Sequence, residues 1–221
     1  IIPEFAYKTL YDSKYHSFYR LSTDEQDTPK IKHKGYYDRL LCKECEQRVG
    51  LYESYASSVF RGKADMEKKV TEKLIVFRNL NYALFKLFFL SILWRASISK
   101  LKEFPIHLGS HEERIRKMLL DQNPGDQFEY GLIASFNPQM QSFLQQMMTI
   151  PESIRIKNHL CYRFLLSGLF WLIIVSSHSY RFPYKDTFLS PDGTLLILVD
   201  VKWSSKFMIE LSKKLNIPEI T

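Results

Sequence analysis

Two cysteines three positions apart, Cys42 and Cys45, are the residues of this chain best suited to chemistry. A Cys-x-x-Cys turn places both sulfurs about 2.3 Å from a common metal ion, the arrangement called a zinc knuckle. Structural zinc takes four ligands, so the pair predicts half of a Zn²⁺ site. Cys161 lies in an apolar run, and we expect a buried core residue there rather than a ligand. His16 and His33 are the alternative further ligands.

Two carboxylates follow the cysteine pair at helical spacing. Glu46 comes directly after Cys45, and its hard oxygen donors suit a catalytic Mg²⁺ or Mn²⁺ ion. The alternative is that Glu46 only complements the dipole of the helix that begins there. Glu53 lies seven residues later on the same helix face, where it either reaches the same cleft or forms a salt bridge. We favour the salt bridge, with Arg48 or Lys63 as its partner.

Cationic and aromatic residues precede the cysteine pair, as expected of a segment that contacts a phosphate backbone. The alternative is a solvated loop with no nucleic-acid partner. The residues that we predict to contact DNA are Lys30, Lys32, Lys34, Arg39 and Lys43.

The positive charge is concentrated in the first half of the chain. The net charge is +7; residues 1–120 contain 22 Lys and Arg against 15 Asp and Glu, whereas residues 121–221 contain nine of each. A basic surface gains affinity for an anionic partner such as DNA through counterion release. A basic surface that is only solvated is the alternative.

The composition predicts a packed core. Of 221 residues, 45% are apolar and 14% are aromatic, which is enough for one domain or two small ones. Three cysteines are too few for a secreted disulfide scaffold, so we expect a reducing, cytoplasmic location. Residues 1–5 are too short for a signal peptide. The apolar segments 82–99 and 164–177 are predicted to be buried core, because the first contains Lys86 and Arg95 and the second falls short of the roughly 20 residues that span a bilayer. No membrane partner is expected.

The middle of the chain is predicted to be helical. Apolar residues at helical spacing predict a helix from Glu46 to Phe60, ended by Gly62. The charged segment 65–78 predicts one helix or two helical pieces. The apolar run 80–99 predicts a helix in the centre of a bundle, since no face of it is polar.

Two further features belong to this helical region. Residues Ser110 to Glu113 match a capping box, which predicts a helix beginning there. Arg95, in the apolar run, needs a partner if it is buried, and Glu113 and Asp121 are the candidates.

Extended patterns begin near residue 126. The runs 128–134, 159–166, 169–175 and 194–201 are rich in β-forming residues and are separated by turn signals. A last helix is predicted at 205–215. The fold class is therefore α+β, with a small irregular N-terminal module, a helical middle and C-terminal antiparallel strands.

Three segments together resemble a known family. They are Ile-Ile-Pro-Glu-Phe at 1–5, Leu-Leu-Cys-x-x-Cys-Glu at 40–46 and Tyr-Glu-Ser-Tyr at 52–55. The chain is similar to HNH-like (treble-clef) endonucleases, and more closely to bacterial HNH-like proteins with the pattern Ser-His-Ile-Ile-Pro-x-Phe, then Leu-Leu-Cys-x-x-Cys-Glu, then a Tyr-Glu-x-Tyr helix. The resemblance covers residues 1–60 well.

The resemblance implies a treble-clef module at residues 1–63, followed by an α+β domain at 64–221. It makes Cys42 and Cys45 the second pair of ligands to a structural Zn²⁺, with the first pair upstream of Ile1 and the general-base histidine just before Ile1. Glu46 and Glu53 are then the candidate catalytic residues of this chain.

The implied function is a metal-dependent nuclease, or a nuclease-derived effector, that acts on DNA in bacterial anti-phage defence. An ATPase or another defence-system protein is the implied partner. The alternative is a non-catalytic module in which zinc scaffolds a DNA- or protein-binding surface. A globular protein without any metal is the third possibility.

Overall fold

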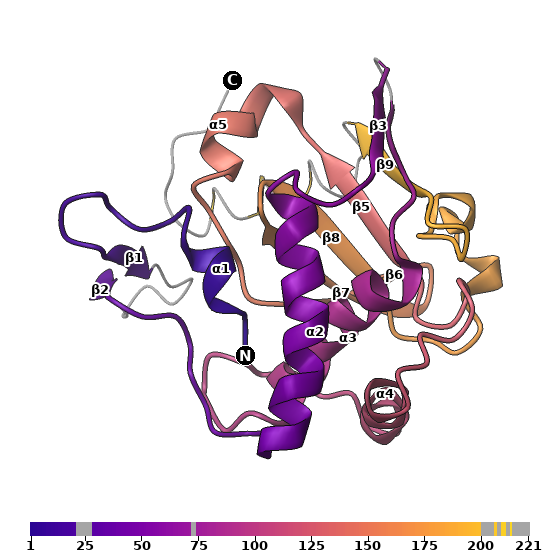
Figure 1. Ribbon diagram of the computed structural model, residues 1–221, viewed down its shortest axis with the longest axis horizontal. Coiled ribbons are helices and arrows are strands. Elements are labelled where there is room, and N and C mark those ends of the chain that lie inside the picture. Colours follow the sequence, from indigo (N-terminus) through magenta and orange to yellow (C-terminus); the bar gives the residue numbers. More distant parts are fainter. Residues whose placement is uncertain (21–27, 72–73, 200–205, 207–208, 211–212, 214–221) are drawn as a thin grey trace.

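The computed structural model describes residues 1–20, 28–71 and 74–199, together with Lys206, Ile209, Glu210 and Lys213 (Figure 1). The predicted helix at 205–215 and the polar loop that begins at Asp24 therefore lie largely outside the described residues. Within them, no helix is long and apolar enough to cross a membrane.

A mixed sheet of seven strands forms the centre of the molecule. Its order is β3 (Glu67–Val70), β4 (Leu74–Arg78), β9 (Leu195–Val199), β5 (Leu132–Phe136), β8 (Leu169–Ile174), β7 (His159–Leu166) and β6 (Glu152–Ile156). All neighbours are antiparallel except β5 and β9, which are parallel. The expected C-terminal strands are present, so the coarse α+β class is confirmed. The predicted arrangement of C-terminal antiparallel strands needs two corrections: β3 and β4, at residues 67–78, also belong to the sheet, and β5 runs parallel to β9.

The hairpin β3–β4 replaces the helix predicted at 65–78. Ile75, Val76 and Phe77 have the branched or aromatic side chains that favour strands, and β4 pairs with β9 from Leu74 to Phe77. All of β3 is exposed at the edge of the sheet, where its charged residues are solvated. The charges that suggested a helix are thus those of an edge strand.

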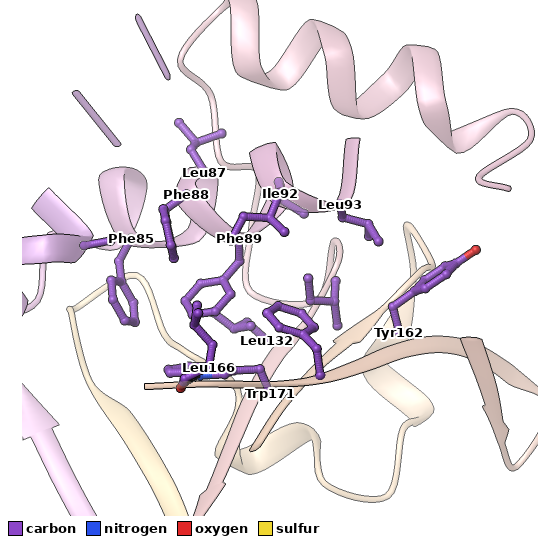
Figure 2. Packing of buried hydrophobic residues seen from close by; sticks show 14 of the residues in the cluster. Phe85, Leu87, Phe88, Phe89, Ile92, Leu93, Leu132, Tyr162, Leu166 and Trp171 are labelled. Atoms are coloured by element: carbon purple, nitrogen blue, oxygen red, sulfur yellow. Dashed lines mark hydrogen bonds between the residues drawn. The ribbon is translucent and has the colours of Figure 1, made fainter. Parts of the chain in front are cut away.

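Helix α3 (Tyr82–Ile98) packs directly on the sheet and confirms the predicted central helix. Eleven of its 17 residues are buried. Figure 2 shows its phenylalanine side chains above Leu132, Leu166 and Trp171 of the sheet. The rings of Phe89 and Trp171 are 4.2 Å apart between centroids. A helix that is covered on every side needs no polar face, which explains the continuous apolar run.

The other face of the sheet is covered too. Leu144 of α5 (Gln141–Leu144) and Phe182 and Phe188 of the 177–190 segment pack over Cys161 and Phe170. The short helices η1 (Pro138–Met140), η2 (Ser179–Arg181) and η3 (Lys185–Thr187) belong to this layer. Strands buried on both faces are apolar at nearly every position, as β7 and β8 are.

Helix α4 (His111–Leu120) begins where the capping box predicted, but the box does not form. The Ser110 side chain makes no capping hydrogen bond, because its backbone is helical (φ −63°, ψ −18°) rather than extended. The Glu113 carboxylate accepts from the Arg116 guanidinium instead, at 2.7 and 2.8 Å.

The N-terminal region consists of α1 (Glu4–Tyr7), the antiparallel pair β1 (Phe18–Arg20) and β2 (Lys30–Lys32), and α2 (Lys43–Phe60). Helix α2 starts three residues before the predicted Glu46 and ends as predicted, followed by Gly62 at φ +65°. Helix α2 packs on α3, and Ile1, Ile2 and Tyr7 belong to the same hydrophobic cluster as α3. One core thus continues across the boundary predicted after residue 63.

Candidate functional site

The two cysteines lie at the start of α2 and face each other. Cys42 is the N-cap residue and Cys45 is in the first turn. Hydrogen bonding from the Cys45 backbone N–H, and then from the Cys45 thiol, lowers the pKa of Cys42. Because Cys45 is the donor in that contact, and is partly desolvated, its own pKa is raised. The exposed Cys42 and half-buried Cys45 therefore converge on one point at the positive end of a helix, where thiolates are favoured.

This pair fits half of a tetrahedral zinc site. In the described part of the chain, no three His, Cys, Asp or Glu side chains come close enough to hold a metal ion. The structure brings neither His16 nor His33 into such a group with the two cysteines. His16 instead stacks on Tyr11, with ring centroids 4.2 Å apart. Cys161 is buried, as predicted, and burial raises its pKa to about 12.

Four charged side chains, two from α2, one from α3 and one from the segment before α2, lie near the backbone nitrogen of Ile1. Ile1 is buried, and the positive charge of Arg95 acts at the position of its nitrogen. The carboxylates of Glu53, Glu46 and Asp38 act on it in the opposite direction. Since such effects need proximity, this position adjoins α2, α3 and the segment that precedes α2. We call Asp38, Glu46, Glu53 and Arg95 the charged cluster.

Glu53 and Arg95 form an ion pair within this cluster. Arg95 Nη1 lies 2.7 Å from Glu53 Oε1, and the two side chains are 9% and 25% exposed. The guanidinium also donates to the carbonyl and hydroxyl oxygens of Ser91, at 3.1 and 3.2 Å. A salt bridge for Glu53 was predicted, but the partners were wrong on both sides. Glu53 pairs with Arg95 rather than with Arg48 or Lys63, and Glu113 pairs with Arg116 rather than with Arg95.

Asp38 is held by the two residues that follow α3. Its Oδ2 accepts from the Ser99 hydroxyl at 3.0 Å and from the Lys100 backbone N–H at 3.3 Å. The Ser99 hydrogen bond is the main reason that the pKa of Asp38 is lowered. Asp38 was not among the predicted site residues, because nothing in its spacing from the cysteines distinguishes it.

Glu46 is the available carboxylate of the cluster. It is exposed and lies in the first turn of α2, directly after Cys45. Its carboxylate has no hydrogen bond or ion pair to any other described residue. Of the two predicted catalytic residues, the structure thus leaves Glu46 free to take a ligand and commits Glu53 to Arg95.

The predicted DNA-contacting residues follow the chain from the β1–β2 hairpin to α2. Lys30 and Lys32 belong to β2, and Lys43 is the first residue of α2. In Figure 1 the hairpin lies beside α1 and the N-terminus, away from the large sheet. All of the five except the half-buried Lys32 are exposed; the set is Lys30, Lys32, Lys34, Arg39 and Lys43.

Comparison with protein-family models, with curated proteins and with solved structures found no match.

Proposed function

We propose that the chain is an HNH-like, zinc-stabilised nuclease, or an effector derived from one, that hydrolyses phosphodiester bonds of DNA. The observation that carries this proposal is the position of Glu46. It follows the cysteine pair on a helix that is itself preceded by an antiparallel hairpin, and it lies in the charged cluster around Ile1. This order of hairpin, cysteines and helix is compatible with the second half of a treble clef.

Zinc in this proposal is structural, with Cys42 and Cys45 as two of its four ligands. The remaining ligands would come from outside the described residues. A zinc ion there would hold the start of α2, and with it Glu46, against the segment that precedes the helix. Three free cysteines, of which two act as metal ligands, suit the reducing cytoplasm.

Glu46 would contribute a ligand to a divalent cation. Mg²⁺ sites often use only one or two carboxylates together with waters and substrate phosphates, so a single exposed carboxylate fits. The chemistry that Mg²⁺ or Mn²⁺ supplies when bound is stabilisation of the charge on the phosphate. Arg95 holds Glu53 and Ser99 holds Asp38, so these carboxylates shape the electrostatic surroundings of the site.

Cleavage of supercoiled plasmid or phage DNA tests this function. We expect nicking or linearisation that requires Mg²⁺ or Mn²⁺ and falls by about 100-fold or more in Glu46→Gln. Glu44→Gln is the matched control, since Glu44 is exposed in the same helical turn and lies outside the charged cluster. The assay is run with the protein alone and with candidate partners such as an ATPase of the same defence system. No cleavage under any of these conditions contradicts the nuclease proposal.

A non-catalytic module is the second candidate. One observation favours it: Arg95 neutralises Glu53, one of the two predicted catalytic carboxylates. DNA or protein binding that depends on Cys42 and zinc, without cleavage, is the result that distinguishes this candidate from the nuclease.

A further inference from the structure

The β1–β2 hairpin and its flanks carry an unusual share of the exposed apolar surface. We call residues 13–20 and 28–37 the arm. Eight large hydrophobic side chains are exposed among the described residues, and half of them lie in the arm. Single exposed apolar residues are normal, but a concentration on one short segment indicates a binding surface. The four, with their exposed fractions, are Tyr15 (66%), Tyr19 (70%), Ile31 (58%) and Tyr37 (75%).

The two faces of the hairpin differ. Phe18 turns toward the core, with its ring 5.4 Å from that of Tyr7 and 5.7 Å from that of Tyr11. Because side chains alternate along a strand, Tyr19 turns the other way, and its cross-strand partner is Ile31. One face thus anchors the arm, while the other presents Tyr19 and Ile31 to solvent.

The charge of the arm is of one sign. It contains five Lys and Arg and no Asp or Glu, although Asp24, Glu25 and Asp27 belong to the connection that lies outside the described residues. Lys14 Nζ lies 5.0 Å from the centre of the Tyr15 ring, so this ring already has a cation over one face. Cations interleaved with exposed tyrosines complement a polyanion whose bases offer flat faces.

The arm ends at the charged cluster. Ile1 N donates to the carbonyl of Tyr36 at 3.3 Å, and Asp38 is a member of the cluster. Tyr37 lies between Tyr36 and Asp38 in the chain, and its side chain is 75% exposed. One end of the arm therefore adjoins Asp38 of the charged cluster.

We propose that the arm binds a single-stranded stretch of DNA, with Tyr19 and Tyr37 stacking on unpaired bases and the exposed Lys34 following the phosphates. This inference rests on the proposed function and names its substrate class. Bases in a duplex are stacked on both sides and are recognised at their edges, by side chains such as Arg, Asn and Gln. The solvent face of the arm offers ring faces instead, which suit bases that are unpaired.

Fluorescence anisotropy without added divalent cation tests this proposal on the whole chain. The probes are a labelled oligothymidylate of about 20 nucleotides, longer than the ~4–16 nucleotides of comparable sites, and a mixed-sequence duplex of the same length. We expect the wild type to prefer the single strand, and Tyr19→Ala with Tyr37→Ala to weaken that binding by about tenfold or more. Both tyrosines are exposed, so an unchanged melting temperature shows that the variant is folded.

Tyr180→Ala is the matched control, because Tyr180 is 51% exposed on η2, outside the arm. It should leave binding unchanged. Lys34→Gln should reduce the salt dependence of binding. No binding of oligothymidylate, a preference for the duplex, or an equal loss in Tyr180→Ala overturns the inference.

The cleavage assay separates this inference from the proposed function. Arm-dependent binding of single strands without any cleavage upholds the inference and contradicts the nuclease. Cleavage that depends on Glu46, together with binding that the arm variants do not change, upholds the nuclease and contradicts the inference.

Discussion

The guanidinium of Arg95 on α3 lies 2.7 Å from the carboxylate of Glu53 on α2 and so joins the two helices within the charged cluster. Both side chains are largely buried, which makes the pair sensitive to the loss of one partner. The same contact occupies one of the two predicted catalytic carboxylates and leaves Glu46 exposed.

Arg95→Met should destabilise the protein by about 3 kcal/mol, because it leaves the Glu53 charge buried without its partner. The double variant Glu53→Leu with Arg95→Met removes both charges and should lose much less. Urea unfolding measures the loss of stability in the two variants. The control is Arg116→Met at the exposed Glu113–Arg116 pair, which should hardly change the free energy of unfolding. Equal losses in the single and double variants would show that the ion pair is not coupled.

Lys86 should make stability depend on pH. Its ammonium is buried in α3, and donates to the Asp126 carbonyl at 2.6 Å and to the Tyr82 hydroxyl at 2.9 Å. Burial lowers the pKa of Lys86 to about 7, although Glu129 and Asp126 act against this shift. Between pH 7 and the ordinary pKa of lysine, the unfolded chain therefore binds more protons than the folded one, so the free energy of unfolding rises with pH.

The measurement for Lys86 is the difference in unfolding free energy between Lys86→Met and the wild type. The unfolding free energy of Lys86→Met does not rise with pH in this way. The amount by which it exceeds that of the wild type should therefore shrink by a few kcal/mol from pH 7 to 10. Below pH 7 the difference should be constant, because the lysine is charged in both states. A difference that does not change with pH over the whole range would contradict the depressed pKa.

Gly193 is required by a close backbone contact. It has φ +80°, and a Cβ atom there would lie 2.3 Å from the carbonyl oxygen of Leu80. Gly193→Ala should therefore cost about 2 kcal/mol or more, since strain and clash add. Gly62 is the matched control, because it also has positive φ (+65°) but has open space around its Cα. Thermal unfolding should show a clearly smaller loss for Gly62→Ala, of about 1 kcal/mol.

Thiol reactivity should follow the position of each cysteine. Cys42 is exposed with a lowered pKa, whereas burial raises that of Cys161 to about 12. In metal-free protein, iodoacetamide should modify Cys42 first and leave Cys161 unmodified in the folded state. Mass spectrometry of the peptides reads out the order. Added Zn²⁺ should protect Cys42 and Cys45 together, and protection of neither would argue against a shared metal.

The sequence predicts best those elements whose burial is simple. Helix α3 and strands β7 and β8 are covered on all sides, so their continuous apolar runs are unambiguous. Helix α2 shows a regular helical spacing from Val49 to Val59. The hairpin β3–β4 was misassigned because its charged edge strand resembles a polar helix, and its pairing with β9 joins residues more than a hundred positions apart. No local pattern reports such a pairing.

The candidate site shows the same division. The spacing of Cys42 and Cys45 predicts their convergence, since a short turn determines it. The partnership of Glu53 with Arg95 depends instead on how α2 crosses α3, and the place of Asp38 depends on Ser99 at the far end of α3. These relationships arise from tertiary packing, which spacing alone does not encode.

Zinc content per chain is the most direct measurement, because both proposed functions need a metal ion at Cys42 and Cys45. Elemental analysis of the protein, together with any residues that its gene encodes before Ile1, should find one tightly bound zinc per chain. Cys42→Ser should lose this zinc, and Cys161→Ala should keep it. A stably folded protein that contains no zinc would contradict the treble-clef proposal and remove the basis for the nuclease.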